Sequence, residues 1–367
     1  MVMQGSMAME QVHGGNVYTL ARRIGCDPCD IIDMSSNMNP FGPPQGLAEF
    51  LKERLADIAM LPEADAYGIR RAFAGLHGID PARVIAANGT TQIIFALPAA
   101  LSVRRALVLV PAYSDYETAC SVCGVDTLFL EASGNDGFAH SADRVIDCIR
   151  EKAPDIVFIC NPNNPTGVLT EKEELLGICR ANPDVVFVID ESYLPFTGRE
   201  HELSMMGSTG LSNLVVLTSM SKIFRIPGLR IGFAACPEKI AALLEQHIPC
   251  WSVNALAHAA AGWLMEHQDM ADGFIAHTVE TVGEERRFVS NSLQGSPDIH
   301  VFPSAACFML LRLGHGMTSR GVYEALAANR ILIRDCSNFR GLSNRYIRIS
   351  LKTRKYNRML VEKLCNL

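Results

Sequence analysis

One lysine lies in a stretch whose residue types could bind and use an aldehyde cofactor. The stretch Thr218–Arg230 reads TSMSKIFRIPGLR, which places Lys222 beside Ser219 and Ser221 and upstream of Arg230. A lysine amine can form a Schiff base with an aldehyde, and hydroxyl groups with a guanidinium can bind a phosphate monoester. Pyridoxal 5'-phosphate (PLP) carries both groups. The stretch therefore predicts a PLP site, and the alternative is a surface lysine in a serine-rich turn.

Length and composition favour a protein that acts on small molecules. The chain has 367 residues, of which 49% are hydrophobic and 20% charged, and its net charge is −6. That length suits one large domain and a smaller one. No run of basic residues indicates nucleic-acid binding, and no apolar run reaches the length of a membrane span. Residues 1–10 lack the pattern of a signal peptide, so we expect a cytoplasmic protein.

The chain has twelve cysteines, and four of them form two Cys-x-x-Cys pairs, Cys26 with Cys29 and Cys120 with Cys123. Two such pairs could hold a zinc ion. Most of the cysteines lie among apolar residues, where a reduced cysteine behaves as a small hydrophobic side chain. We therefore expect no metal site.

From about residue 80 the pattern is that of an α/β protein. Apolar runs of strand length alternate with segments of helix length, which predicts a mostly parallel sheet covered on both faces. The expected strands are residues 83–86, 106–110, 127–130, 156–159, 185–189, 214–217 and 231–235. Ligands of such sheets bind at the carboxyl ends of the strands. Polar motifs follow five of the runs, at residues 88–91, 111–113, 161–167, 190–193 and 219–222.

The remaining segments suggest an N-terminal arm and a second unit. Before the sheet we expect helices at 17–24, 47–58 and 67–77 and an extended segment at 31–44. After it we expect a helical stretch at 237–267, a helix ending at 293, strands at 307–313, 331–334 and 346–351, a helix near 322–328 and a terminal helix. The predicted domains are an arm at 1–45, a large PLP-binding domain at 46–280 and a small domain at 281–367, completed by part of the N-terminal segment.

Several motifs could supply the other contacts of the cofactor. Thr90 and Thr91 begin an apolar helix, whose free N–H groups favour an anion; the alternative is a plain helix cap. Asp190 ends an apolar strand and could pair with a pyridine nitrogen, unless it only caps a turn. Tyr193 and Asn164 could hydrogen-bond a ring hydroxyl.

Further candidates are an aromatic side chain and two arginines. Tyr113 could stack on the ring or serve only in packing. Arg348 lies between apolar residues of a strand, where it needs a carboxylate or phosphate partner. Arg334 has the same character, although it could simply pair with Asp335. The Asn164–Pro165 bond lies in a tight loop where a cis peptide is possible.

Together these motifs resemble the fold-type I PLP enzymes of the aminotransferase class I/II family. The resemblance covers nearly the whole chain and implies a PLP-dependent α/β fold. Its large domain has a mostly parallel seven-stranded sheet, and its smaller C-terminal domain is α+β. It also implies a homodimer. By resemblance Lys222 is the Schiff-base lysine and proton shuttle, and Asp190 pairs with the ring nitrogen. The other implied contacts are Tyr193 and Asn164 with the ring hydroxyl, Tyr113 with the ring face, Thr90, Thr91, Ser219, Ser221 and Arg230 with the cofactor phosphate, and Arg348 with the substrate α-carboxylate.

Two branches of this family look closest. The general layout is similar to histidinol-phosphate aminotransferases. Three segments, 13–16, 35–43 and 334–342, look more like the L-threonine-O-3-phosphate decarboxylases of cobalamin biosynthesis. That likeness implies that His13, Asn39 and Arg334 face the substrate, with Arg334 at its phosphate. We therefore expect decarboxylation of a small phosphorylated amino acid, with transamination as the alternative. A non-catalytic binding protein of this fold is a third possibility, and the intact Lys222, Asp190 and Arg348 argue against it.

The sequence departs from the family pattern at three places. Leu61 stands where the family usually has a tyrosine that reaches the partner subunit's cofactor phosphate, so either Tyr67 replaces that contact or it is absent. Cys307 replaces a common asparagine before Phe308. Arg340 replaces a common proline in a Phe-Pro-Gly motif. These departures concern the substrate rather than the cofactor.

Overall fold

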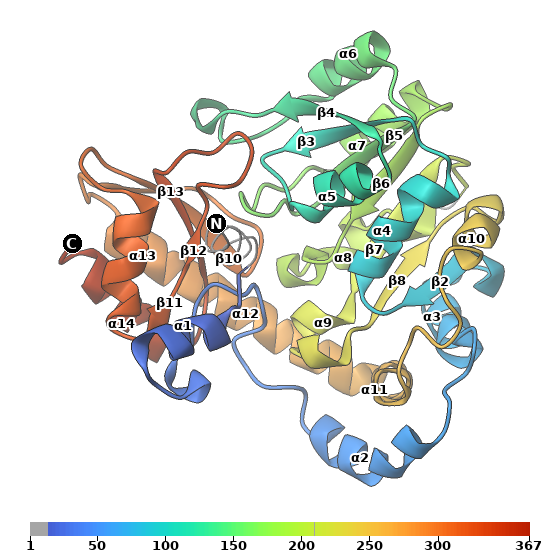
Figure 1. The fold of residues 1–367 in the computed structure, drawn as a ribbon, viewed down its shortest axis with the longest axis horizontal. Helices are drawn as coiled ribbons and strands as arrows, with labels where there is room; N and C mark the ends of the chain where they lie inside the picture. The colour runs from blue at the N-terminus through green and yellow to red at the C-terminus, as the bar shows by residue number, and fades with distance from the viewer. Residues whose placement is uncertain (1–13, 209) are drawn as a thin grey trace, which may run out of the picture.

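A seven-stranded sheet forms the larger part of the protein in the computed structural model, which describes residues 14–208 and 210–367 (Figure 1). Its spatial order is β2-β8-β7-β6-β5-β3-β4. The strands are β2 (Val84–Ala87), β3 (Arg105–Val110), β4 (Asp126–Glu131), β5 (Ile156–Cys160), β6 (Val186–Asp190), β7 (Leu214–Ser219) and β8 (Gly232–Ala235). Strand β8 runs antiparallel to both of its neighbours, and the other pairs are parallel. The seven predicted strands and their mostly parallel arrangement are confirmed.

The sheet needs helices on both faces because several of its strands are buried along their whole length. Every residue of β2, β5 and β8 is buried, so both faces of these strands exclude water. The helices of this part of the chain are α2 (Leu47–Glu53), α3 (Tyr67–His77), α4 (Thr90–Ala100), α5 (Asp115–Val122), α6 (Ala142–Lys152), α7 (Lys172–Ala181), α8 (Glu200–Leu203), α9 (Met220–Ile223), α10 (Glu238–Glu245) and α11 (Ala255–Glu266). Among the described residues, no helix combines the length and apolarity that crossing a membrane requires.

The smaller unit is built on a four-stranded antiparallel sheet in the order β12-β13-β10-β9. Its strands are β9 (Ile299–Val301), β10 (Phe308–Leu313), β12 (Arg334–Asp335) and β13 (Tyr346–Ser350), and its helices are α12 (Gln268–Leu293), α13 (Ser319–Ala327) and α14 (Arg354–Leu364). The N-terminal segment, with α1 (Val17–Ile24), joins this unit, because β1 (Ile32–Asp33) pairs in parallel with β11 (Ile331–Leu332). In Figure 1 these elements lie together at the left.

Three predicted elements differ from the structure. The helical stretch at 237–267 is two helices, α10 and α11, because Pro249 lies in the break and Asn254 caps α11 by accepting from the Ala257 N–H. The helix at 47–58 ends at residue 53 and continues as a short 3-10 turn. The strand at 331–334 is divided between β11 and β12, which belong to different sheets. The domain boundary placed at residue 280 falls inside the continuous helix α12.

Because β8 runs antiparallel to its neighbours, its first residue lies at the edge of the sheet where β2 and β7 end. Gly232, the first residue of β8, is the partner of Ser219 in β7 and of Ala87 in β2. A Cβ atom at Gly232 would lie 2.5 Å from the Thr90 backbone nitrogen, so only glycine permits this approach. The segment before β8 therefore reaches the edge where the parallel strands end.

Candidate active site

A cavity at this edge of the sheet brings together most of the residues that the sequence singles out. Nine of them line it: Thr90, Thr91, Tyr113, Asn164, Asp190, Tyr193, Ser219, Lys222 and Arg230. They come from five different strand ends and from the segment before β8, as expected for a ligand site of a mostly parallel sheet. The cavity is also lined by Gly89, Tyr116, Cys160 and Ser192, which the sequence analysis did not select.

Lys222 lies in the short helix α9, directly after β7, and is half-buried. Burial is the main cause that lowers the pKa of its amine below the usual 10.5, and the nearby Arg230 guanidinium lowers it further. Asp190 acts in the opposite direction. A lowered pKa increases the fraction of neutral amine near neutral pH, and the neutral amine is the form that attacks an aldehyde.

Asp190 ends β6 and is buried, with both carboxylate oxygens already hydrogen-bonded. Its Oδ1 accepts from the Ser192 backbone N–H at 3.0 Å, and its Oδ2 accepts from the Tyr116 hydroxyl at 2.8 Å. Burial is the main cause that raises the Tyr116 pKa well above 10, so this hydroxyl stays a donor. Tyr116 lies in α5, where nothing in its sequence context distinguishes it from a packing residue. These two bonds fix the orientation of the carboxylate at the cavity.

A cradle for an anion forms where β2 ends and α4 begins. Helix α4 starts at Thr90, so its first backbone N–H groups have no partner within the helix. Arg230 approaches so closely that a Cβ atom on Gly89 would lie 2.7 Å from its Nη2. The Ser219 hydroxyl lines the same cavity, but Ser221 does not: it is buried, and its hydroxyl donates to the Ile231 carbonyl at 3.4 Å. The phosphate contact predicted for Ser221 stays a prediction.

Tyr193 and Asn164, the two residues expected at the ring hydroxyl, are both buried. Each is hydrogen-bonded by a residue that does not line the cavity. The Tyr193 hydroxyl accepts from the Asn37 side-chain amide at 3.2 Å, and the Asn164 side-chain oxygen accepts from Arg348. Asn37 in turn accepts from the Ser350 hydroxyl at 3.0 Å. The sequence analysis did not select Asn37. The Asn164–Pro165 peptide is cis, as predicted.

The donor set of this cavity fits the parts of PLP. The neutral amine of Lys222 suits the aldehyde, the Asp190 carboxylate suits the ring nitrogen, and the cradle at α4 with Arg230 suits the phosphate. One buried side-chain atom at the cavity, the Ser192 hydroxyl oxygen, has no hydrogen-bond partner among the described residues. An unpaired buried hydroxyl is costly, and a bound polar molecule would supply its partner.

The two predicted substrate arginines stand directly opposite each other in the small sheet, Arg334 in β12 and Arg348 in β13. Both are buried. Arg348 donates to Asn164 and, at 2.7 Å, to the Ser35 carbonyl, while its Nε has no partner among the described residues. Arg334 donates to the Asp335 backbone carbonyl at 2.6 Å, so this contact is not the carboxylate pairing considered above. Burial lowers the Arg334 pKa to about 10.

Neither arginine lines the cavity of Lys222, but both adjoin it. Arg348 touches it through Asn164, and Arg334 lines a neighbouring cavity that shares Tyr113 with it. The Tyr113 hydroxyl donates to the Asp115 carboxylate at 2.6 Å, and its ring meets the Tyr116 ring edge-on with the centroids 5.7 Å apart. Tyr113 therefore separates the two cavities.

Asn39, a further candidate for the substrate site, does not line the cavity of Lys222. Asn39 is buried, and its amide hydrogens are both used, by the Ile223 carbonyl at 2.8 Å and the Thr278 hydroxyl at 2.6 Å. Its backbone N–H also donates to the Lys222 carbonyl at 3.0 Å. These contacts hold Asn39 next to α9 and Lys222, and its predicted substrate contact stays a prediction. His13 lies outside the described residues.

Comparison with known proteins gives the family. A family model described as aminotransferase class I and II matches residues 29–364. The chain belongs to this family. It is a PLP-dependent enzyme, a decarboxylase or an aminotransferase, and the predicted cofactor and fold are confirmed.

The relatives of this class I/II enzyme include threonine-phosphate decarboxylases and histidinol-phosphate aminotransferases. The chain is 31% identical over 360 residues to the threonine-phosphate decarboxylase of Salmonella typhimurium, covering 96% of each. It is 30% identical over 360 residues to the histidinol-phosphate aminotransferase of Methanocella arvoryzae, covering 98% of this chain and 96% of the relative. It also matches the adenosylcobalamin biosynthesis bifunctional protein CobDQ of Leptospira interrogans at 29% identity, with 97% of the chain spanning only 41% of that relative.

A solved structure shows the same fold. The L-threonine-O-3-phosphate decarboxylase from Porphyromonas gingivalis superimposes with a TM-score of 0.82 at 29% identity, covering 91% of this chain and 98% of the other.

The departures at Leu61 and the cysteine pairs can now be placed. Leu61 is 76% exposed and Tyr67 is 53% exposed, so neither side chain enters the cavity of its own chain. Among the described residues, no group of three or more His, Cys, Asp or Glu side chains could hold a metal ion. Cys29 and Cys123 are exposed free thiols.

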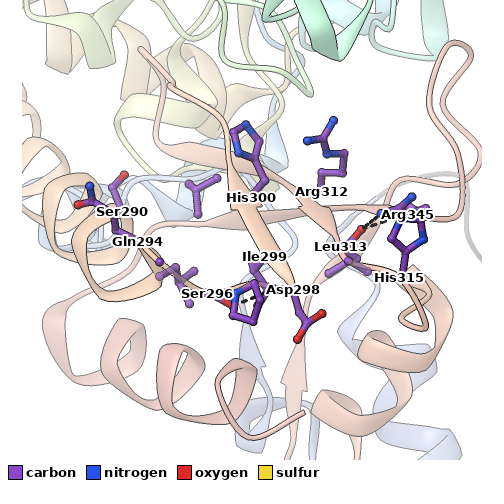
Figure 2. Close-up of a pocket in the computed structure, with 15 residues that line it drawn as sticks. Ser290, Gln294, Ser296, Asp298, Ile299, His300, Arg312, Leu313, His315 and Arg345 are labelled. Atoms are coloured by element: carbon purple, nitrogen blue, oxygen red, sulfur yellow. Dashed lines mark hydrogen bonds between the residues drawn. The ribbon is translucent and has the colours of Figure 1, made fainter.

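The class I/II enzyme has a larger hollow in the small unit, which Figure 2 shows in close-up. It is about 670 Å³ in volume and is lined by residues between the end of α12 and the turn after β10, together with Arg345. His300 and Arg312 point to the same side from neighbouring strands, and Arg345 donates to the Leu313 carbonyl (Figure 2). None of the predicted site residues lines this hollow, and it has no lysine. Size alone therefore does not identify the active site.

Glu191, the neighbour of Asp190, gives the fold a predicted dependence on pH. It is buried and accepts from the Ser204 hydroxyl at 2.6 Å and from the Met205 N–H at 2.7 Å. Burial raises its pKa from 4.5 to about 8. The folded protein thus keeps a proton that the unfolded chain releases, and the stability this provides is lost as the pH rises through that range.

We expect the free energy of unfolding to fall between pH 4.5 and about 8 because of this group, at a slope approaching about 1.4 kcal/mol per pH unit. Glu191→Gln should remove this fall, since glutamine is neutral throughout. Urea unfolding at a series of pH values measures the effect, with the exposed Glu238→Gln as control. An unchanged pH profile in Glu191→Gln would show that Glu191 is ionised in the folded protein.

Proposed function

We propose that this enzyme decarboxylates a small phosphorylated amino acid, most closely L-threonine O-3-phosphate. The observation that carries the proposal is the pair of buried, directly opposed arginines, Arg334 and Arg348. Two like charges repel and are costly to bury. A substrate that carries both a carboxylate and a phosphate would offset that cost, because each anion can take one guanidinium. Threonine phosphate has both groups in one molecule.

The residues of the chain have separate tasks in this reaction. PLP, when bound, supplies an aldehyde and a ring that takes up the electrons of a bond broken at the substrate α-carbon. The Asp190 carboxylate keeps the ring nitrogen protonated. Arg348 binds the α-carboxylate and Arg334 binds the phosphate. The bond from the α-carbon to the carboxylate then breaks, carbon dioxide leaves, and Lys222 carries a proton to the α-carbon to give aminopropanol phosphate.

A phosphorylated amine such as histidinol phosphate is the second candidate, because a histidinol-phosphate aminotransferase is 30% identical to the chain. In a transamination Lys222 would take the proton from the α-carbon and would return it to the cofactor instead. Incubation with threonine phosphate and PLP, without a keto acid, separates the two reactions. Stoichiometric carbon dioxide and aminopropanol phosphate support the proposal. Turnover that requires 2-oxoglutarate and forms glutamate would contradict it.

Arg334→Ala tests the phosphate role. We expect kcat/KM for threonine phosphate to fall by roughly 100-fold, because a charge-assisted, bidentate contact to phosphate is lost. The inhibition constant of unphosphorylated L-threonine should change little. Steady-state kinetics and inhibition assays give both values, and Arg312→Ala, an arginine of the same unit away from the cavity, is the matched control. Equal losses for both ligands would remove Arg334 from the phosphate role.

We also propose a homodimer, supported by an exposed apolar segment between α2 and α3. Leu55, Ile58, Met60 and Leu61 are each more than half exposed there, with Tyr67 at the start of α3. A large exposed apolar patch marks an interaction surface, and a second copy of the chain is the partner this family implies. Light scattering tests this: a molar mass of 40.1 kDa would contradict the dimer. The described cysteines are all free, which supports a reducing compartment such as the cytoplasm.

A further inference from the structure

The turn between β12 and β13 connects the small unit to the large sheet. Arg340 in this turn donates to the Glu117 carboxylate of α5 at 2.8 Å. Its guanidinium carbon also lies 3.8 Å from the centre of the Phe129 ring in β4. The next residue, Gly341, has φ +81° and approaches Pro111, which follows β3. In Figure 1 the segment between β12 and β13 extends toward β3 and β4. The turn therefore contacts helix α5, strand β4 and the residue that follows β3.

The same turn holds the predicted phosphate ligand. The Asn338 side-chain oxygen accepts from Arg334 at 2.8 Å, and the Phe339 ring lies 4.9 Å from the Arg334 guanidinium carbon. Arg334, Asn338, Phe339 and Arg340 all line the small cavity that meets the cofactor cavity at Tyr113. Residues 338 and 339 thus orient Arg334, and residue 340 anchors them to the opposite unit.

The ion pair between Arg340 and Glu117 should affect the substrate site more than it affects the stability of the fold. The Arg340 and Glu117 side chains are 45% and 43% exposed. An ion pair with that exposure contributes at most about 1 kcal/mol to stability, so removing it should leave the protein folded. A shift of the turn by a small distance, however, misplaces a guanidinium that must meet a phosphate in a fixed geometry.

We propose that Arg340 is a positioning residue that sets the affinity for the phosphorylated substrate. It holds the turn against Glu117 and Phe129, so that Asn338 and Phe339 present Arg334 to the phosphate. This inference rests on the proposed function, in which Arg334 binds the phosphate. It also gives a role to the arginine that replaces the proline common in the family.

Three variants test the role. Arg340→Ala should raise KM for threonine phosphate by about tenfold, the combined effect of one exposed ion pair and one cation–π contact, while kcat changes less than about threefold. The inhibition constant of L-threonine should stay unchanged. Glu117→Gln should reproduce part of the KM increase. Arg340→Lys should keep the KM close to the wild-type value, since an ammonium also pairs with Glu117. Arg199→Ala, which removes the exposed Arg199–Glu171 pair at 3.0 Å elsewhere in the large unit, is the control.

The results distinguish a failure of this inference from a failure of the proposed function. The charge-swapped double variant Arg340→Glu/Glu117→Arg should recover part of the KM, because the ion pair is restored with its charges exchanged while the cation–π contact with Phe129 is not. Arg340→Ala with a wild-type KM, or with equal losses for threonine phosphate and threonine, would overturn the positioning role. A double variant that is folded, as judged by its thermal unfolding midpoint, but shows no recovery of the KM would also overturn the positioning role. If Arg334→Ala does not selectively weaken the use of the phosphorylated ligand, the proposed function itself fails. If Arg334→Ala has this selective effect but Arg340→Ala does not, only this inference is overturned.

Discussion

Lys222→Ala should abolish turnover and the covalent retention of PLP. We expect kcat to fall by at least about 1,000-fold, because the variant loses both the amine that attaches the cofactor and the group that carries the proton. The reason lies in the setting of Lys222: its amine is half-buried beside Arg230 and has a lowered pKa, so it is poised as a nucleophile. The measurement is the initial rate with saturating PLP, together with the visible absorbance that the wild-type protein shows with bound PLP.

Lys239→Ala is the matched control, since this lysine is exposed on α10 and does not line the cavity. It should retain wild-type activity and spectrum. The variant Lys222→Ala should still bind PLP noncovalently, because the α4 cradle and Arg230 remain. A Lys222→Ala protein with a turnover within tenfold of wild type would contradict the assignment of this residue.

Asp190→Asn should reduce kcat by roughly 1,000-fold, the second largest effect that we expect. Asparagine has a similar shape and keeps an oxygen for the Ser192 N–H or the Tyr116 hydroxyl, so the substitution chiefly removes the negative charge. Without that charge a bound pyridine nitrogen loses its proton, and the ring becomes a poor acceptor of electrons. Rates measured at saturating PLP, beside the equilibrium affinity for PLP, separate the loss of chemistry from weaker binding.

Tyr116→Phe provides the comparison for Asp190. It removes one hydrogen bond to the carboxylate but leaves the charge, so we expect a loss of about tenfold or less in kcat. The more conservative Asp190→Glu should retain part of the activity because the charge stays. Asp190→Asn with nearly full activity would show that this carboxylate does not hold the ring nitrogen protonated.

The sequence identified the sheet and most of the cavity because strand patterns and motifs are local. Most of the seven strands contain a short apolar run, and strands such as β2 and β5 are buried throughout, so a propensity argument suffices. The motifs at Asn164, Asp190 and Lys222 directly follow strands. The rule that ligands bind at strand ends then places them together without knowledge of the tertiary structure.

The contacts that orient these groups could not be read from the sequence, because they join distant segments. Tyr116 and Asp190 are 74 residues apart, and Asn37 and Tyr193 are 156 apart. The hydrogen bonds of Ser221 and Asn39 could not be read from the sequence either, since a hydroxyl or amide inside a ligand motif can also bond to the backbone. Ser221 donates to Ile231, and Asn39 to Ile223 and Thr278.

The position of Arg340 shows the same limit. Its replacement of a common proline was visible in the sequence, but its partners, Glu117 and Phe129, lie in another unit. Only the three-dimensional arrangement connects the turn, through Asn338, to Arg334. We therefore expect substrate specificity to depend on contacts between units, whereas the motifs of the cofactor site are local.

The most direct test of the account is to locate the covalent cofactor in the wild-type protein. PLP-loaded protein is reduced with borohydride, digested, and analysed by peptide mass spectrometry. We predict the mass of the reduced cofactor on the peptide that contains Lys222, and on no other lysine. A stoichiometric adduct on another lysine, or none after reduction of fully loaded protein, would contradict the central claim that Lys222 faces Asp190 and Arg230 as the cofactor-binding amine.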